Sequence, residues 1–212
     1  MTLLAMRQSD LEEKMNLPNK LTVLRLFMVP LIVIVMLLPM NPVLSNVLAA
    51  AVFGLTALTD MLDGKIARKY NLITDFGKFL DPLADKFMVI STLVVLLFKF
   101  DGVLRFCCLI STLIVIMREL AVTSIRLVVS SSAGIVVAAN MLGKIKTVSQ
   151  IVYILCAFLE PVLFFLINKL FSLSIPDYHV LTYASMLVMT VFTIWSGINY
   201  LGSYWKYLDT NK

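Results

Sequence analysis

The stretch L21-T-V-L-R-L-F-M-V-P-L-I-V-I-V-M-L-L38 decides the fold class of this chain. Its length is close to the roughly 20 apolar residues that a helix needs to cross a bilayer. Further runs of the same character follow, so six spans are expected, at Leu21–Leu38, Val43–Leu62, Leu83–Phe98, Val103–Val129, Ile145–Leu170 and Tyr178–Leu201. Helices are the form that fits, because open strands leave backbone groups unpaired in lipid. We therefore predict an all-α, polytopic membrane protein with six transmembrane helices.

The composition of the whole chain also indicates a membrane protein. Of its 212 residues, 60% are hydrophobic and 15% are charged, and the mean hydropathy is +0.93. Soluble domains have about 45–50% apolar and about 25% charged residues. A single core of this size cannot bury the apolar excess, so lipid must solvate much of the surface, which excludes a soluble α/β enzyme. The three cysteines show no C-x-x-C spacing, so neither a disulfide scaffold nor a zinc site is indicated.

The distribution of basic residues predicts the orientation. Six spans place both termini on one side of the membrane. Three basic residues fall on the opposite side (Lys99, Arg105 and Lys169), against nine on the side of the termini: Arg7, Lys14, Lys20, Lys65, Arg68, Lys69, Lys78, Lys206 and Lys212. The positive-inside rule therefore predicts that both termini are cytoplasmic. This topology accounts for the net charge of +5, and no nucleic-acid partner is expected.

The segment before the first span is polar and moderately amphipathic. We expect residues 1–20 to form an extension or juxtamembrane segment, and residues 21–212 to form one six-helix domain. The N-terminal segment is either an interfacial helix along the cytoplasmic surface or a frayed extension.

Acidic residues cluster between the second and third spans. The chain reads D60-M-L-D-G-K-I-A-R68 and, after eight residues, G77-K-F-L-D-P-L-A-D85. Asp60 and Asp63 are three apart, and Asp81 and Asp85 are four apart, so each pair shares one helix face. A short loop makes the two helices antiparallel neighbours. We therefore expect the four carboxylates to converge on one point at the cytoplasmic side.

Four carboxylates this close repel one another, so either some stay protonated or divalent cations neutralise them. All-oxygen ligation favours Mg²⁺ or Mn²⁺. Four shared carboxylates are enough for two ions about 3.5–4 Å apart, the arrangement used for in-line displacement at phosphorus. Small residues in phase with the acids, Gly64, Ala67 and Gly77, leave room for a ligand near the backbone. Arg68 supplies a planar fork suited to phosphate oxygens.

At these residues the sequence resembles the CDP-alcohol phosphatidyltransferase family. The family signature, D-x-x-D-G-x-x-A-R, eight residues, then G-x-x-x-D-x-x-x-D, is matched at every fixed position. The similarity begins near Met15, and the stretches Asn16–Arg25, Met117–Arg126 and Leu142–Thr147 are similar to bacterial members that use glycerol 3-phosphate. The resemblance implies transfer of a phosphatidyl group from CDP-diacylglycerol to sn-glycerol 3-phosphate, with release of CMP. It also implies a homodimer in the bacterial cytoplasmic (inner) membrane, surrounded by membrane lipids, with its active site facing the cytoplasm.

The resemblance also implies roles for single residues. Two divalent metal ions, Mg²⁺ or Mn²⁺, sit among Asp60, Asp63, Asp81 and Asp85, and Asp85 matches the base for the incoming hydroxyl. Positions that match the nucleotide site are Gly64, Ala67, Arg68 and Gly77.

Basic residues inside the later spans suggest a second phosphate site. An arginine within a span is expected to face the bundle interior or a water-filled cavity. Arg118, Arg126 and Lys144 are therefore expected to bind the phosphate of the acceptor. The alternative is that Arg118 pairs with Glu119 or Glu160 as structural glue, while the lysines meet anionic lipid headgroups. Lys146 points about 200° away from Lys144 on a helical wheel, so it is expected to contact headgroups only.

Three other functions are weighed against this one. The same chemistry with serine or inositol phosphate as the acceptor is the nearest, although the basic residues favour a phosphorylated acceptor. Intramembrane prenyltransferases also use aspartate-rich motifs, but theirs lie far apart in sequence. A cation transporter would place polar residues across the whole membrane depth, whereas these acids cluster at one interface.

Overall fold

The computed structural model describes residues 17–69, 75–133, 141–172 and 174–205, with side chains omitted at 17–18, 63–69, 75–76, 78 and 131–133. This part of the chain contains six helices and no strand: α2 (Leu17–Leu37), α3 (Pro42–Lys69), α4 (Asp75–Lys99), α5 (Gly102–Ala133), α6 (Met141–Phe171) and α7 (Val180–Tyr204). The all-α prediction is confirmed, and each of the six expected spans is a helix. Of the expected N-terminal segment, residues 1–20, the last four form the start of α2, and residues 1–16 lie outside the described residues.

Five helices are long and apolar enough to cross a membrane, with spans at Asn19–Leu37, Pro42–Leu62, Gly102–Ser130, Met141–Phe171 and Val180–Tyr204. The chain is therefore a multi-pass membrane protein. The remaining helix, α4, starts at Asp75, well before Leu83, where the expected apolar run begins. Its first turns carry the charged residues Asp81, Asp85 and Lys86 close together, and this charge separates it from the five apolar spans.

Local sequence explains where α3 begins. Pro42 occupies the first helical position, where its missing N–H costs no hydrogen bond. The preceding Asn41 accepts a hydrogen bond on its side-chain oxygen from the Val43 N–H, at 2.9 Å. A side-chain acceptor just before a helix satisfies one of the N–H groups that have no partner within the helix.

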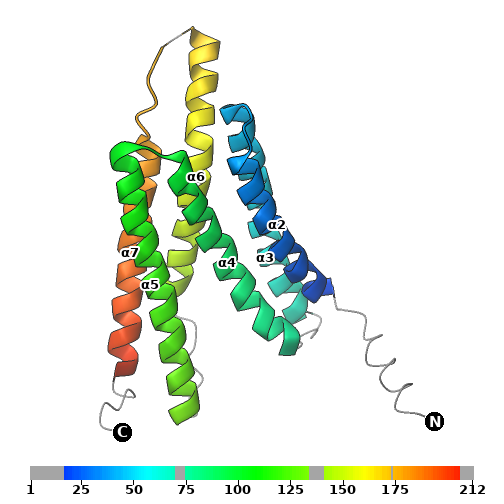
Figure 1. The fold of residues 1–212 in the computed structure, drawn as a ribbon. Helices are drawn as coiled ribbons and strands as arrows, with labels where there is room; N and C mark the ends of the chain where they lie inside the picture. The colour runs from blue at the N-terminus through cyan, green and yellow to red at the C-terminus, as the bar shows by residue number, and fades with distance from the viewer. Residues whose placement is uncertain (1–16, 70–74, 134–140, 173, 206–212) are drawn as a thin grey trace, which may run out of the picture.

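The helices run up and down, so the starts of α2, α4 and α6 lie at the same end as the ends of α3, α5 and α7. This is the lower end in Figure 1, and we refer to it as the site end. Helix α2 packs against α3 and α4, and α7 packs against α5 and α6. Figure 1 shows α4 and α5 meeting at their short connection and diverging toward the site end, and α4 packs against α2.

In the apolar core, helix α3 packs against helix α6. Phe53 of α3 and Phe158 of α6 are both fully buried, and their rings meet edge to face with centroids 6.4 Å apart. Large apolar side chains also cover the outside of the bundle, among them Phe27, which is 73% exposed. A surface of this kind is stable only against lipid, which agrees with the spans.

One buried face of α2 changes character along its length. From the site end, the buried residues are first polar (Asn19, Thr22 and Arg25) and then apolar (Val29 and Ile32). Arg25 is the largest of the fully buried side chains. The polar part of this face lies beside the predicted carboxylate cluster.

At the end opposite the site end, a carboxylate from α6 caps α7. Glu160 is 1% exposed and accepts hydrogen bonds from the Leu181 N–H (2.8 Å), the Thr182 N–H (2.7 Å) and the Thr182 hydroxyl (2.6 Å). Helix α7 starts at Val180 with no side-chain cap of its own. Glu160 therefore satisfies the first N–H groups of α7 and places a negative charge at the positive end of that helix.

Glu160→Ala is expected to lower the stability of the protein by about 1.5–3 kcal/mol, the usual contribution of a hydrogen bond to a charged group. The melting temperature of the purified protein in detergent measures this loss. Glu160→Gln keeps a hydrogen-bond acceptor and should lose less. Equal melting temperatures for Glu160→Ala and the wild type would mean that the cap does not stabilise α7.

Candidate active site

A polar pocket of about 470 Å³ opens at the site end, between α4, α5, α6 and α7. Its lining includes four of the residues predicted from the sequence: Asp85, Arg118, Arg126 and Lys144. These side chains come from three helices, and the divergence of α4 from α5 provides the space between them. Other polar side chains complete the lining: Lys86, Glu119, Lys146, Thr147 and Tyr200. The pocket is therefore predominantly basic, with Asp85 and Glu119 as its carboxylates.

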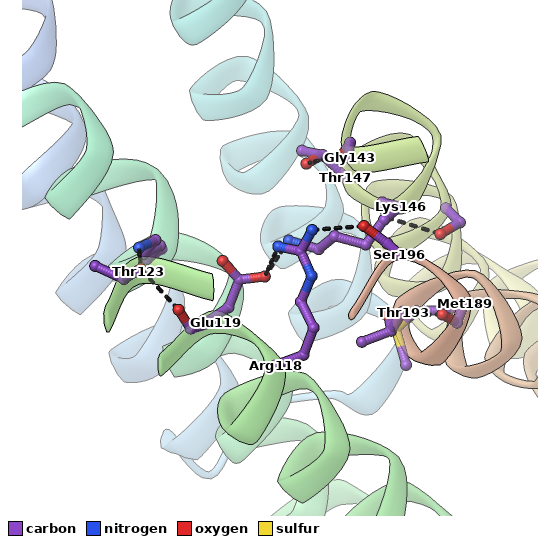
Figure 2. A network of polar contacts seen from close by, with 11 residues as sticks. Arg118, Glu119, Thr123, Gly143, Lys146, Thr147, Met189, Thr193 and Ser196 are labelled. Carbon is purple, nitrogen blue, oxygen red and sulfur yellow. Dashed lines mark hydrogen bonds and ion pairs between the residues drawn. The ribbon is translucent and has the colours of Figure 1, made fainter. Parts of the chain in front are cut away.

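An ion-pair network forms one wall of this pocket. Figure 2 shows Arg118 and Lys146 pointing toward the same carboxylate, that of Glu119. The Arg118 Nη1 atom lies 3.1 Å from Glu119 Oε1, and the Lys146 Nζ atom contacts that same oxygen. All three side chains are at most 10% exposed. The Arg118 Nη2 group also donates to the Ser196 hydroxyl of α7, at 2.6 Å.

Helix α7 fixes the two arginines from the other side. The Tyr200 ring lies 5.6 Å from the Arg118 guanidinium carbon and 5.7 Å from that of Arg126, within the range of cation–π attraction. Gly197 lies against the Arg118 stem, and a Cβ atom there would come within 3.3 Å of Arg118 Cγ. A side chain at position 197 would therefore crowd the arginine. Arg118 therefore both forms the ion pair with Glu119 that was the alternative prediction and lines the pocket.

The expectation for Lys146 was wrong. Lys146 is 6% exposed, pairs with Glu119 and lines the pocket, whereas a headgroup contact would leave it on the surface. Lys144 is exposed and lines the pocket as well. The two lysines lie in the first turns of α6, and residues on different sides of this helix start line the pocket. A lysine stem is long enough to bring its ammonium group to the pocket from either side of the helix.

The predicted metal-binding aspartates that are described lie on α3 and α4. Asp60 interacts electrostatically with Asp81 and with Asp85, so the three carboxylates lie near one another. The Asp60 side chain is 40% exposed, which leaves it accessible to a ligand. Asp85 also interacts with Lys146 and Glu119, and it connects the carboxylates to the basic pocket.

Parts of the predicted site fall outside the described side chains. Asp63, Gly64, Ala67 and Arg68 lie on the last turns of α3, and only their helical backbone is described. Gly77 is buried in the first turns of α4. Of the four residues predicted for the nucleotide site, the described part of the chain gives burial for Gly77 alone.

The donor chemistry of the aspartates fits Mg²⁺ or Mn²⁺, because carboxylate oxygens are the ligands that hard cations prefer. Among the residues with described side chains, Asp60, Asp81 and Asp85 do not form a group whose ligand atoms all lie within 4.8 Å of one another. Ligands distributed over two ions about 3.5–4 Å apart need not be that close. A tighter group consists of Glu160, Asp177 and His179 at the opposite end. Both Glu160 oxygens there already accept hydrogen bonds from α7.

Two residues of α2 contact the aspartates and were not predicted. The Arg25 Nη1 atom lies 2.5 Å from Asp60 Oδ1, and the Thr22 hydroxyl donates to Asp81 Oδ1 at 2.6 Å. The sequence carried a signal for Arg25, since an ionisable residue inside an apolar span is a candidate functional residue. Thr22 carries no charge, and its signal was its place, together with Arg25, in the stretch Asn16–Arg25 that resembles family members.

Comparison with known proteins gives consistent matches. A family model described as CDP-alcohol phosphatidyltransferase matches residues 15–196, from the predicted start near Met15 into α7. A Bacillus subtilis protein named CDP-diacylglycerol–glycerol-3-phosphate 3-phosphatidyltransferase is 38% identical over 93% of this chain and 99% of its own length. Proteins of that name from Wigglesworthia glossinidia brevipalpis and Pseudomonas fluorescens are 34% and 31% identical. They cover 82% and 93% of this chain, and 92% and 94% of their own lengths.

Proposed function

The chain belongs to the CDP-alcohol phosphatidyltransferase family, and on this premise we propose that it transfers the phosphatidyl group of CDP-diacylglycerol to sn-glycerol 3-phosphate. The products are phosphatidylglycerol phosphate and CMP. The names of its relatives support this donor and this acceptor.

One observation carries the choice of acceptor. The pocket beside Asp85 is lined by Arg118, Arg126, Lys144 and Lys146, and Glu119 offsets only part of this positive charge. A basic pocket next to carboxylates fits an acceptor that brings its own phosphate group to the reaction. Serine has no phosphate to place in this basic pocket, so it fits the pocket less well. Inositol phosphate remains the second candidate, because it satisfies the same charges.

The carboxylates of Asp60, Asp63, Asp81 and Asp85 are the residues that would hold two divalent cations, Mg²⁺ or Mn²⁺. When bound, such ions counter the negative charge on the pyrophosphate and on the departing CMP. Asp63 enters this set on the sequence motif alone. Gly64, Ala67, Arg68 and Gly77 are proposed, also on the motif, to shape the site for the cytidine nucleotide.

The residues of the chain itself bind the acceptor, orient its hydroxyl group and accept the proton of that hydroxyl. Arg126, Lys144 and Lys146 hold the acceptor phosphate, and Arg118 is held in place by Glu119, Ser196 and Tyr200. This arrangement directs the hydroxyl of the acceptor toward Asp85. An Asp85 oxygen accepts the hydroxyl proton as the new oxygen–phosphorus bond forms and the bond to CMP breaks. A positioned base of this kind contributes about 10²–10⁴-fold to a rate.

We also propose that the site end faces the cytoplasm of a bacterial cell, in its inner membrane, and that both termini lie on that side. The excess of basic residues at this end supports the orientation. The soluble acceptor and the released CMP would then enter and leave from the cytoplasm. Assembly as a homodimer stays a prediction from the family resemblance.

The acceptor is tested by lipid product analysis. Purified protein with CDP-diacylglycerol is mixed with glycerol 3-phosphate, inositol phosphate or serine, and the product is identified by mass spectrometry. Phosphatidylglycerol phosphate is the expected product. A phosphatidylserine product would contradict the phosphate pocket, and ion transport without CMP release would contradict the enzyme.

Arg126→Ala and Lys144→Ala are expected to lower kcat/KM for glycerol 3-phosphate by roughly 10- to 150-fold, the value of one charge-assisted contact. The KM for CDP-diacylglycerol should change little. Lys169→Ala is the matched control, since Lys169 is an exposed lysine at the far end of the same helix as Lys144. A higher KM for CDP-diacylglycerol with an unchanged KM for the acceptor would mean that the pocket is wrongly assigned.

A further inference from the structure

One helix contacts carboxylates from two others. Thr22 and Arg25 are three residues apart on α2, so they share one face, and both are 0% exposed. Thr22 contacts Asp81 of α4 at 2.6 Å, and Arg25 contacts Asp60 of α3 at 2.5 Å. Helix α2 thus connects the two helices that carry the predicted metal ligands.

Each of these contacts is made to a single oxygen of its aspartate. Thr22 donates to the Oδ1 atom of Asp81, and Arg25 pairs with the Oδ1 atom of Asp60. A carboxylate has two oxygens, so a fixed Oδ1 sets the direction of the other one. Asp60 is 40% exposed although Arg25 is fully buried, so the contact holds the carboxylate from the protein side and leaves it open on the other.

We propose that Thr22 and Arg25 are positioning residues, which orient Asp81 and Asp60 for divalent cations. The inference rests on the proposed function, since it concerns the same carboxylates. Partners that hydrogen-bond a metal-binding side chain fix its orientation, and losing one usually costs about 10- to 100-fold in metal affinity. Helix α2 supplies two such partners from one face.

The burial of Arg25 is difficult to explain by packing alone. A charged side chain within a membrane span is costly and is retained where it has a partner and a function. An apolar residue would fill the same space without that cost. The polar part of the α2 face ends at Arg25, and the following buried positions, Val29 and Ile32, are apolar. The polar residues are thus confined to the depth of the aspartates.

Thr22→Val provides the sharpest test, because valine has nearly the same shape and lacks only the hydroxyl. The full-length protein is purified in detergent, and Mn²⁺ affinity is measured from the electron paramagnetic resonance signal of free Mn²⁺. We expect Thr22→Val to bind Mn²⁺ about 10-fold more weakly than the wild type. Thr22→Ser restores the hydroxyl and should restore the affinity.

The matched control is Thr92→Val. Thr92 is also 0% exposed, but its hydroxyl donates to the Met88 carbonyl of its own helix, at 2.8 Å. This variant removes a buried hydroxyl without touching an aspartate, and its Mn²⁺ affinity should equal that of the wild type. Arg25→Lys keeps the charge without the planar fork, so it should also weaken Mn²⁺ binding.

The outcomes separate this inference from the proposed function. Wild-type affinity in Thr22→Val, or equally weak binding in Thr22→Ser, would overturn the positioning role. If the wild type released CMP normally in that case, the proposed function would stand. A wild-type protein that bound no Mn²⁺ would overturn both the positioning role and the metal site.

Discussion

Asp81→Asn should reduce the rate of CMP release by about 10³-fold. A metal ion stabilises the charge of a phosphoryl-transfer transition state by several kcal/mol, and about 4 kcal/mol corresponds to this factor. Asparagine keeps a side-chain oxygen that can accept a hydrogen bond from the Thr22 hydroxyl, so the variant removes the charge and keeps the contact. Initial rates of CMP release, measured at saturating Mg²⁺ and with both substrates, give the loss.

The control for this substitution is Asp101→Asn. Asp101 forms a salt bridge with Arg105 at the end opposite the site end, and its side chain is 89% exposed. We expect this variant to keep the wild-type rate. A rate within a few-fold of wild type in Asp81→Asn would contradict the role of Asp81 as a metal ligand.

Glu119→Ala should destabilise the protein by about 3–5 kcal/mol, the usual cost of removing one partner of a buried ion pair. Without the carboxylate, Arg118 and Lys146 face each other as two buried positive charges. The melting temperature in detergent, with and without glycerol 3-phosphate, measures the effect. The acceptor phosphate should recover part of the loss, because it can neutralise the same cations.

A double variant separates the stability of this network from its function. Glu119→Gln with Lys146→Met replaces the buried charge pair by neutral groups of similar size, which is often neutral for stability. We expect a melting temperature near that of the wild type and a raised KM for glycerol 3-phosphate. A stable double variant with an unchanged KM would mean that Lys146 serves the fold alone.

The apolar runs predicted the helices because lipid requires every backbone group to be paired within the span. They did not predict where a helix continues beyond the lipid. The run at Leu83 marks the apolar part of α4, but hydrogen bonding continues back to Asp75 through residues that hydropathy does not identify as helical. The start of α4 was therefore missed, although the helix itself was predicted.

The basic pocket could be predicted only in part, and Lys146 shows why. A helical wheel gives the direction of each Cα–Cβ bond around one helix, and on that measure Lys146 and Lys144 point apart. The wheel contains no information on the neighbouring helix. Glu119 of α5 attracts the Lys146 ammonium group, so the partner decides where this lysine lies.

Arg25 was missed for a different reason. The rule that a charge within a span indicates a functional site was applied to the aspartates and to Arg118. The same rule applies to Arg25, which lies inside the first apolar run. Its partner, Asp60, was already singled out, but the pairing depends on the packing of α2 against α3, and one sequence does not show which helices are neighbours.

The cap of α7 has a consequence for how the chain enters the membrane. The ribosome completes α6 before α7 exists, and during this interval the Glu160 carboxylate lacks the N–H groups that bind it in the folded protein. A charged side chain within an apolar helix opposes stable insertion. Synthesis of α7 removes this penalty, because its first backbone N–H groups then reach Glu160. The Glu160 carboxylate of α6 therefore gains its hydrogen-bond partners only when α7 packs beside it, so a chain truncated after α6 would lack the N–H groups that this carboxylate binds in the folded protein.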